Sequence, residues 1–327
     1  MKLETVLDAM ARQDVDVMVL GREANARAVA GTTRLWLAGT RAFSPGCVVV
    51  RDRGAVHVLS NSDDAVPAGF PTERLYGITW NPEKLVAALA AIPGMTDARR
   101  VAVDGMTPMM HTLLSHLAPA AEFTDAAPVL TDLWARPDPE RREGVRGAAT
   151  VASAGLAAMV DALRPGVRPR TLRGACAQAF ASFGVTTPAF EAVAAPLDAS
   201  TSTWLSPERI LAEHELVVLR AGALRDGWEA SLARTYRVGA HNAQGHAVEQ
   251  PPPERWQLLV DACRPGVTAG ALRAQGAVVY GAGRGVEPWD DDFTLAAGMT
   301  CALEVSEVQA VRQDVLLIGE REPELLT

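Results

Sequence analysis

An internal repeat constrains the fold of this chain more than any other feature. The segment Val160-Asp-Ala-Leu-Arg-Pro-Gly-Val167 recurs as Val260-Asp-Ala-Cys-Arg-Pro-Gly-Val267, with seven identities in eight positions at an offset of 100 residues. Leu172-Arg173 recurs at the same offset as Leu272-Arg273. A period of this length is too long for a solenoid and indicates a duplicated α+β unit within one domain. In such a pseudo-twofold domain we expect the functional site where the two halves meet.

The part of the chain before the repeat has a different pattern, in which short apolar runs alternate with helical periodicity. The pattern predicts helices over 5–12, 83–91 and 106–117, and strands over 15–20, 47–50, 55–59 and 101–104. Alternation of helices and strands is typical of an α/β domain.

The segment Ala135-Arg-Pro-Asp-Pro-Glu140 separates the two patterns, because two prolines among mixed charges favour a linker. We therefore predict an N-terminal α/β domain over residues 1–135 and a second domain over residues 136–327. The second domain begins with a long helix over 140–163 that stops at Arg164-Pro165-Gly166. Strand-like segments follow at 215–222, 228–238, 278–285, 298–305 and 311–318. They predict an antiparallel sheet with helices on one face.

Composition narrows the classes of function. Hydrophobic residues make up 48% of the 327 residues, enough for a full core, and the net charge is −8. That charge argues against nucleic-acid and membrane-surface partners, which need clustered Lys and Arg. The N-terminus has no signal-peptide pattern, and no window reaches the ~18 apolar residues of a membrane span. None of the four cysteines belongs to a CxxC pair, which favours free thiols in a reducing cytoplasm.

Five segments, in order along the chain, carry a resemblance to a known group of enzymes. They are Asn25–Gly31, the helix from Asp138, Leu216–Gly222 with Asp226–Thr235, Tyr280-Gly-Ala-Gly-Arg-Gly-Val-Glu-Pro288, and Leu295–Met299 through Glu304. These segments resemble motifs of the creatinase, Xaa-Pro aminopeptidase and prolidase superfamily, over nearly the whole chain. The resemblance implies a creatinase-like α/β N-terminal domain and an α+β pita-bread domain with a pseudo-twofold repeat.

The resemblance also implies a metal site, which this sequence departs from. Peptidases of the superfamily hold two divalent ions with two Asp, one His and two Glu, and the metal pair generates a hydroxide nucleophile. The matching positions here are Arg220, Ser231, Tyr280, Glu304 and Gln313. One carboxylate of the set remains, and arginine keeps its proton and repels a cation. We therefore expect no metal and no other cofactor.

The proton-transfer histidines of the superfamily are also replaced. Their positions fall near Trp204 and at Val286, and all six histidines of the chain lie outside the motifs. Only six residues separate Arg273 from Tyr280, where the superfamily has a longer helix.

Three interpretations of this altered site are open. The first is a metal-independent enzyme, for example a C–N hydrolase or lyase, acting on a small amino-acid-like or carboxylate substrate. The second is a catalytically inactive relative that binds a ligand or a protein, with Arg220 simply paired to Glu304. The third is an Xaa-Pro metallopeptidase whose ligands are displaced, for which Asp226, Glu229, the run 290–292 and Asp314 are available acids.

The first interpretation assigns roles to particular residues. Glu304 is the candidate acid or base, and Tyr280 the candidate donor to an oxyanion. The candidate substrate-binding residues are Arg220, Arg234, Ser231, Gln313, Trp204, Arg284, Arg34 and Trp36. The last two are included because in similar proteins the N-terminal domain of a second subunit reaches over the active site, which implies a homodimer.

Overall fold

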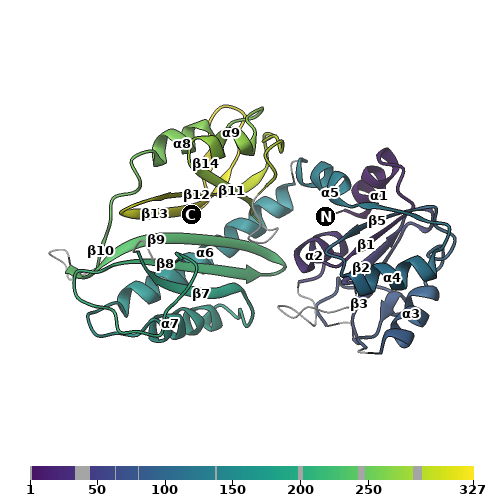
Figure 1. Ribbon diagram of the computed structural model, residues 1–327, viewed down its shortest axis with the longest axis horizontal. Helices are drawn as coiled ribbons and strands as arrows, with labels where there is room; N and C mark the ends of the chain where they lie inside the picture. The colour runs from purple at the N-terminus through teal and green to yellow at the C-terminus, as the bar shows by residue number, and fades with distance from the viewer. Residues whose placement is uncertain are drawn as a thin grey trace. The chain divides into compact units, whose positions relative to one another are not determined.

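The computed structural model describes residues 2–33, 45–62, 64–79, 81–136, 138–197, 202–241, 247–282 and 289–327. Of the predicted site residues, Arg34, Trp36 and Arg284 lie outside these ranges. The chain forms two compact units, Met1–Arg136 and Pro137–Thr327 (Figure 1).

The first unit is a mixed sheet with helices on both faces. Its strands are β1 (Val17–Leu20), β2 (Cys47–Val50), β3 (Ala55–Leu59), β4 (Leu75–Tyr76), β5 (Arg100–Asp104) and β6 (Glu122–Asp125). They lie in the order β4-β3-β2-β1-β5-β6, and β1, β5 and β6 run parallel to one another. The helices are α1 (Leu3–Arg12), α2 (Glu23–Ala30), α3 (Pro82–Ala90), α4 (Pro108–Leu117) and α5 (Ala127–Trp134), with short 3-10 turns at Arg51–Arg53 and Thr72–Arg74.

Two apolar clusters fill the spaces above and below this sheet. One cluster joins α1, α2 and α5 to residues such as Met18 and Leu20, and the other joins α3 and α4 to Val17 and Val19. Successive residues of β1 therefore point to opposite clusters, which requires a strand that is apolar on both sides. This three-layer arrangement confirms the α/β pattern predicted from the sequence.

The second unit is built on one curled antiparallel sheet. Its strands are β7 (Pro188–Pro196), β8 (Leu216–Arg225), β9 (Trp228–His241), β10 (Ala247–Glu249), β11 (Ala277–Gly281), β12 (Thr300–Glu307), β13 (Ala310–Leu317) and β14 (Glu324–Leu325). The main order is β11-β12-β13-β9-β8-β7, while β10 pairs with β9 and β14 with β13. The strand predicted over 278–285 ends at Gly281, because Ala282 already lies in a turn.

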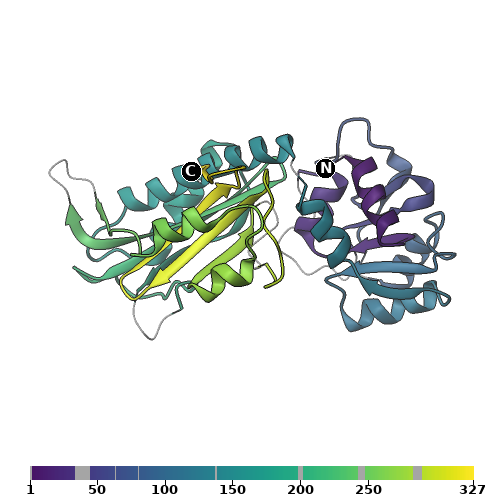
Figure 2. The ribbon, with the colours of Figure 1, turned by 90° about the horizontal axis from the view of Figure 1, so that it is seen from above.

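The helices of the second unit are α6 (Pro139–Asp161), α7 (Pro169–Ser182), α8 (Trp256–Ala262) and α9 (Ala269–Ala274). Helix α6 begins where the side chain of Asp138 accepts the backbone N–H groups of Glu140 and Arg141, with Pro139 in the first turn. Figure 2 shows this long teal helix running beside the green and yellow strands.

The internal repeat appears in the second unit as two matching turns. The N–H of Gly166 donates to the carbonyl of Leu211 at 3.0 Å, and the N–H of Leu211 donates to Val167 at 2.9 Å. In the second copy, Gly266 donates to Leu295 and Leu295 to Val267, each at 2.9 Å. Both glycines have a positive φ, +83° and +88°, which a residue with a Cβ adopts only under strain. The repeated Arg-Pro-Gly-Val therefore ends one helix, starts the next and ties down a distant loop in each half.

The two halves differ in the length of their helices. Helices α6 and α7 have 23 and 14 residues, whereas α8 and α9 have 7 and 6. The short segment between Arg273 and Tyr280 thus reflects a shortened α9, which leads into β11 after a two-residue turn.

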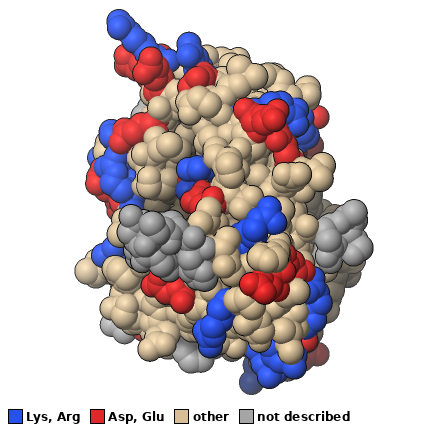
Figure 3. All heavy atoms as spheres, turned by 90° about the vertical axis from the view of Figure 1, so that its left-hand side faces the viewer, with Lys and Arg blue, Asp and Glu red and all other residues tan. Residues whose placement is uncertain are grey.

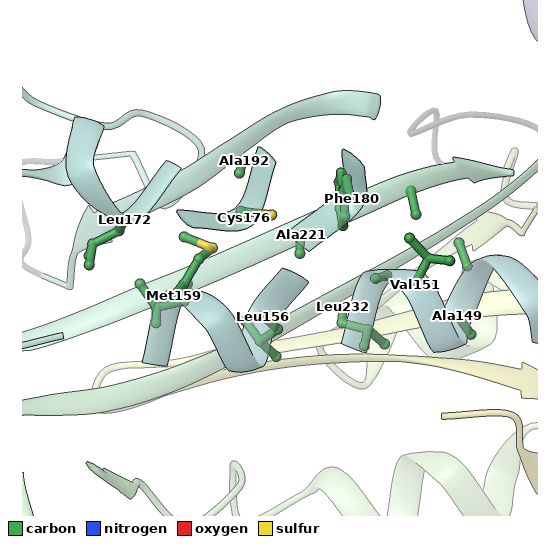
Figure 4. Close-up of a cluster of buried hydrophobic side chains, with 14 of the residues drawn as sticks. Ala149, Val151, Leu156, Met159, Leu172, Cys176, Phe180, Ala192, Ala221 and Leu232 are labelled. Carbon is green, nitrogen blue, oxygen red and sulfur yellow. The ribbon is translucent and has the colours of Figure 1, made fainter. Parts of the chain in front are cut away.

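The core of the second unit lies between α6, α7 and the face of β7, β8 and β9 (Figure 4). Leu156 and Met159 of α6 and Phe180 of α7 lie in this layer with Ala221 and Leu232 from the strands. The two helices approach closely at Gly155. A Cβ there would lie 2.3 Å from the Phe180 ring and 2.8 Å from the Sγ of Cys176.

Charged side chains of both signs are intermixed over the coloured part of the face in Figure 3. Such a surface offers no broad positive patch to a phosphate backbone. Among the helices of the described residues, none is long and apolar enough to cross a membrane.

We predict that Gly155→Ala destabilises the second unit, since the added methyl overpacks the contact between α6 and α7. Overpacking of a core costs about 1–3 kcal/mol. Gly174→Ala in α7 is the matched control, because a Cβ there would meet nothing within 4 Å. The control removes a helical glycine without a clash and should raise stability by about 0.5–1 kcal/mol. Urea unfolding measures both. A Gly155→Ala variant as stable as Gly174→Ala would contradict the described packing.

Candidate functional site

The candidate site is organised by one transverse row of residues across the sheet of the second unit. The hairpin turn at Asp226-Gly227, both with positive φ, sets the register of β8 and β9 so that Arg220 pairs with Ala233. Ala233 pairs in turn with Gln313, and Gln313 with Glu304. Residues that pair in register point to the same face of a sheet. The side chains of this row therefore share one face of the sheet, on which Arg220 reaches Glu304.

Arg220 is fully buried, and all five of its N–H donors are used. Nη1 donates to Oε2 of Glu304 at 2.9 Å and to Oε1 of Gln313 at 3.1 Å. Nη2 donates to Oε1 of Glu304 at 2.9 Å and to Oγ1 of Thr203 at 3.2 Å, and Nε donates to the carbonyl of Thr203 at 3.0 Å. The pair with Glu304 is therefore bidentate, the geometry in which an arginine binds a carboxylate most strongly.

The Glu304 carboxylate is equally well satisfied. Besides the two bonds from Arg220, Oε1 accepts the hydroxyl of Ser306 at 3.2 Å and Oε2 accepts the hydroxyl of Tyr280 at 3.3 Å. Burial, and then the negative charge of Glu304, raise the pKa of Tyr280 well above its ordinary value, and the charge of Arg220 only partly opposes this. The Tyr280 hydroxyl therefore stays protonated and acts as a donor.

Gln313 and Ser231 extend the cluster to β9. Oε1 of Gln313 accepts from Arg220, and its Nε2 donates to the Ser231 hydroxyl at 2.7 Å. The five positions that match the metal ligands of the superfamily are thus joined in one hydrogen-bonded cluster.

A turn at residues 202–205 covers one edge of this cluster. The Trp204 ring stacks on the guanidinium of Arg220, with 4.1 Å from Cζ to the ring centroid, and Phe190 packs edge-on against Trp204 at 5.4 Å. Gly222 makes room for Phe190, because a Cβ there would lie 2.2 Å from the Phe190 ring. Gly222, Phe190 and Trp204 together hold the turn against the sheet.

The structure brings together six of the predicted site residues: Arg220, Ser231, Tyr280, Glu304, Gln313 and Trp204. It adds Thr203 and Ser306, which the sequence analysis missed. Ser306 follows Glu304 by two positions in a strand and therefore shares its face, so strand periodicity was a usable signal. The backbone carbonyl of Thr203 has no counterpart in the sequence pattern.

Arg234 lies apart from this cluster. It follows Ala233 in β9, and its side chain points to the opposite face, where it pairs with Asp314 and reaches Glu249. Asp314 is fully buried and also accepts from Arg312 at 2.8 Å. Arg234 thus holds β9 to β13 and does not join Arg220 as a clamp. The roles predicted for the residues of the cluster, in catalysis and in substrate binding, stay predictions.

Comparison with known proteins identifies the family of the chain that carries this cluster. A model of the Creatinase/Prolidase N-terminal domain matches residues 2–133, and a model of Metallopeptidase family M24 matches residues 143–314. The second match covers more than half of the chain. It contains all five positions that match the metal ligands of the superfamily, which are Arg220, Ser231, Tyr280, Glu304 and Gln313. The chain belongs to metallopeptidase family M24.

Relatives in family M24 include two enzymes named Xaa-Pro dipeptidase. The one from Lactobacillus helveticus is 27% identical over 157 residues, which are 47% of this chain and 43% of that enzyme. The one from Pyrococcus furiosus is 23% identical over 232 residues, 63% of this chain and 67% of that enzyme. The first alignment thus spans less than half of the relative.

Solved structures show the same fold over the whole chain. A prolidase from Pyrococcus horikoshii OT3 aligns with a TM-score of 0.73 and 16% identity, covering 99% of this chain and 97% of that one. An X-Pro aminopeptidase from Thermotoga maritima aligns with a TM-score of 0.74 and 12% identity, covering 100% and 97%. These likenesses confirm the pita-bread fold.

The residues of the cluster do not fit the metal pair that the M24 name implies. A guanidinium, a protonated phenol and an amide replace anionic and imidazole donors, and the one carboxylate left is bonded to Arg220. Among the described residues, no group of three or more His, Cys, Asp or Glu is placed to hold a metal ion.

We predict strong energetic coupling between Arg220 and Glu304. Arg220→Met leaves a buried carboxylate without its cation and should cost about 3–5 kcal/mol, as should loss of the Glu304 charge. The double variant Arg220→Met/Glu304→Gln removes both charges and should lose far less than the sum of the single losses. Denaturant unfolding of the four chains completes the cycle. Additive single and double effects would show that the ion pair is not formed.

Proposed function

We propose that this chain is a metal-independent, non-hydrolytic member of family M24, in which the former peptidase centre serves to bind a ligand or partner. The closed Arg220–Glu304 pair is the observation that carries this proposal. A cation that uses all its donors faces a carboxylate that accepts four hydrogen bonds, so neither member of this pair, within the described part of the site, is free to activate water.

Electrostatics support the same conclusion. In a metallopeptidase the carboxylates and the histidine together attract divalent cations. Here Arg220 places a permanent positive charge on the row, and Glu304 already neutralises it. A second cation at this position would be repelled by Arg220 and would meet no free carboxylate in the cluster.

We predict that the purified chain retains no stoichiometric Mn, Co or Zn and does not hydrolyse Xaa-Pro dipeptides when these metals are added. Elemental analysis and a dipeptide assay measure this. The matched control restores the ligand types of the superfamily: Arg220→Asp, Ser231→Asp, Tyr280→His and Gln313→Glu in one chain. Added metal should raise the melting temperature of that variant and leave the wild type unchanged. Near-stoichiometric metal in the wild type, together with dipeptide hydrolysis, would refute the proposal.

A metal-independent enzyme is the second candidate function, and one observation favours it. The protonated Tyr280 hydroxyl lies 3.3 Å from Glu304, so an acid and a carboxylate stand side by side in the family's site. A C–N hydrolase or lyase acting on a small amino-acid-like substrate would use Glu304 as its acid or base.

For this second candidate, Glu304→Gln must abolish turnover, because an amide neither accepts nor releases a proton at working pH. Full activity of that variant would exclude Glu304 from the chemistry. Ser306→Ala is the matched control: it removes one hydrogen bond to the same carboxylate and should leave most of the activity. Assays of small C–N compounds with the three chains measure this.

The homodimer and the cytoplasmic location expected from the sequence stay predictions.

The M24 relatives named above are dipeptidases, and a small molecule with a free carboxylate is the class of ligand that we infer for this site as well.

A further inference from the structure

One edge of the Arg220 guanidinium is covered by a single residue, Thr203. Nε donates to the Thr203 carbonyl at 3.0 Å, and Nη2 donates to its Oγ1 at 3.2 Å. Nε–H and one Nη2–H lie side by side on a guanidinium and form an edge that accepts both oxygens of a carboxylate. Thr203 therefore presents two neutral oxygens where a bound carboxylate would present its two charged ones.

The opposite edge of the same guanidinium is fixed to the sheet. The bonds from Nη1 and Nη2 to Glu304 come from β8 and end on β12, both interior strands of the sheet. If a ligand took the place of Thr203 at the guanidinium, the bonds from Arg220 to Glu304 would remain intact. Arg220 is thus held in position by one edge, while its other edge is bonded only to a turn.

That turn lies at the surface. Ser202 and Leu205 are exposed, Thr203 and Trp204 are half-buried, and the turn is closed by a hydrogen bond from the Leu205 N–H to the Ser202 carbonyl at 3.0 Å. A ligand that approaches from solvent meets this turn first. Its displacement would free the Nε–H and one Nη2–H of Arg220 and would also move Trp204 off the guanidinium.

The charges select the kind of ligand. A carboxylate offers the guanidinium a bidentate partner of opposite charge, whereas Thr203 offers two neutral oxygens, so a carboxylate competes well with Thr203. Glu304 already balances the charge of Arg220, and a simple anion would add an uncompensated charge to a buried site. A zwitterion brings a carboxylate with no net charge.

We propose that the Nε/Nη2 edge of Arg220 binds the carboxylate of an amino-acid-like zwitterion, and that the turn at residues 202–205 is displaced when it binds. This inference rests on the proposed function, because a peptidase centre would hold metal ions in place of the guanidinium. It names the ligand class of that site and assigns Thr203 as the residue that occupies it in the free protein.

Thr203→Val tests the proposal, since valine keeps the shape of threonine and removes the hydroxyl acceptor. The Nη2 N–H then lacks its partner until a ligand oxygen replaces it. We expect Thr203→Val to bind glycine about tenfold more tightly than the wild type does, the loss of one competing hydrogen bond. Calorimetric or NMR titration measures the affinity. Glycinamide, which has the same amine and no carboxylate, should bind both chains at least tenfold more weakly than glycine.

Thr150→Val on α6 is the matched control, because its exposed hydroxyl bonds only to the Arg146 carbonyl at 3.1 Å. It should bind glycine as the wild type does. Equal affinity of Thr203→Val and the wild type, or equal binding of glycine and glycinamide, would overturn the proposal.

Failure of the proposed carboxylate site can be distinguished from failure of the proposed function. Metal-dependent hydrolysis of dipeptides by the wild type would remove both proposals. A chain that holds no metal and hydrolyses no dipeptide, but whose glycine affinity does not respond to Thr203→Val, would remove only the carboxylate site.

Discussion

The buried ion pair between Arg220 and Glu304 is the interaction on which the centre of the second unit depends. A guanidinium buried without acceptors is among the most costly groups in a protein, and it persists only when every donor is met. Here the acceptors come from β12, β13 and the turn at residues 202–205. One side chain of β8 is therefore bonded to three other segments of the second unit.

The pair forms because the two halves of the repeat are held in a fixed register. The turn at Asp226-Gly227 places Arg220 opposite Ala233, and β13 carries the row onward to Glu304. A shift of one residue in any of these pairings would send a charged side chain to the face covered by α6 and α7. The two Arg-Pro-Gly-Val turns are bonded to the loops at Leu211 and Leu295, which lead into β8 and β12, the strands that carry Arg220 and Glu304.

Much of this could be predicted from the sequence, because it depends on local signals. The repeat, the helix stops and the order of motifs are properties of the residue types. They led to the correct fold and to six of the residues that meet in the cluster. Contacts made by backbone groups have no such signal in the sequence. Thr203 binds Arg220 partly through its carbonyl, which every residue has. Arg234 seemed equivalent to Arg220 as a basic residue of a family motif, yet strand alternation sends it to Asp314 on the other face.

An arginine at a position where the superfamily has a metal ligand changes what such a site is able to do. A metal ion exchanges its ligands, lowers the pKa of a bound water and so supplies a nucleophile. A guanidinium coordinates no water and keeps its proton, so it supplies only fixed charge and a fork of donors. Both cations recognise the oxygens of a substrate, but only the metal activates water. In a chain whose row keeps one carboxylate and gains Arg220, recognition of an oxyanion is therefore the part of the family's chemistry that we propose it retains, at the edge of the guanidinium that Thr203 covers.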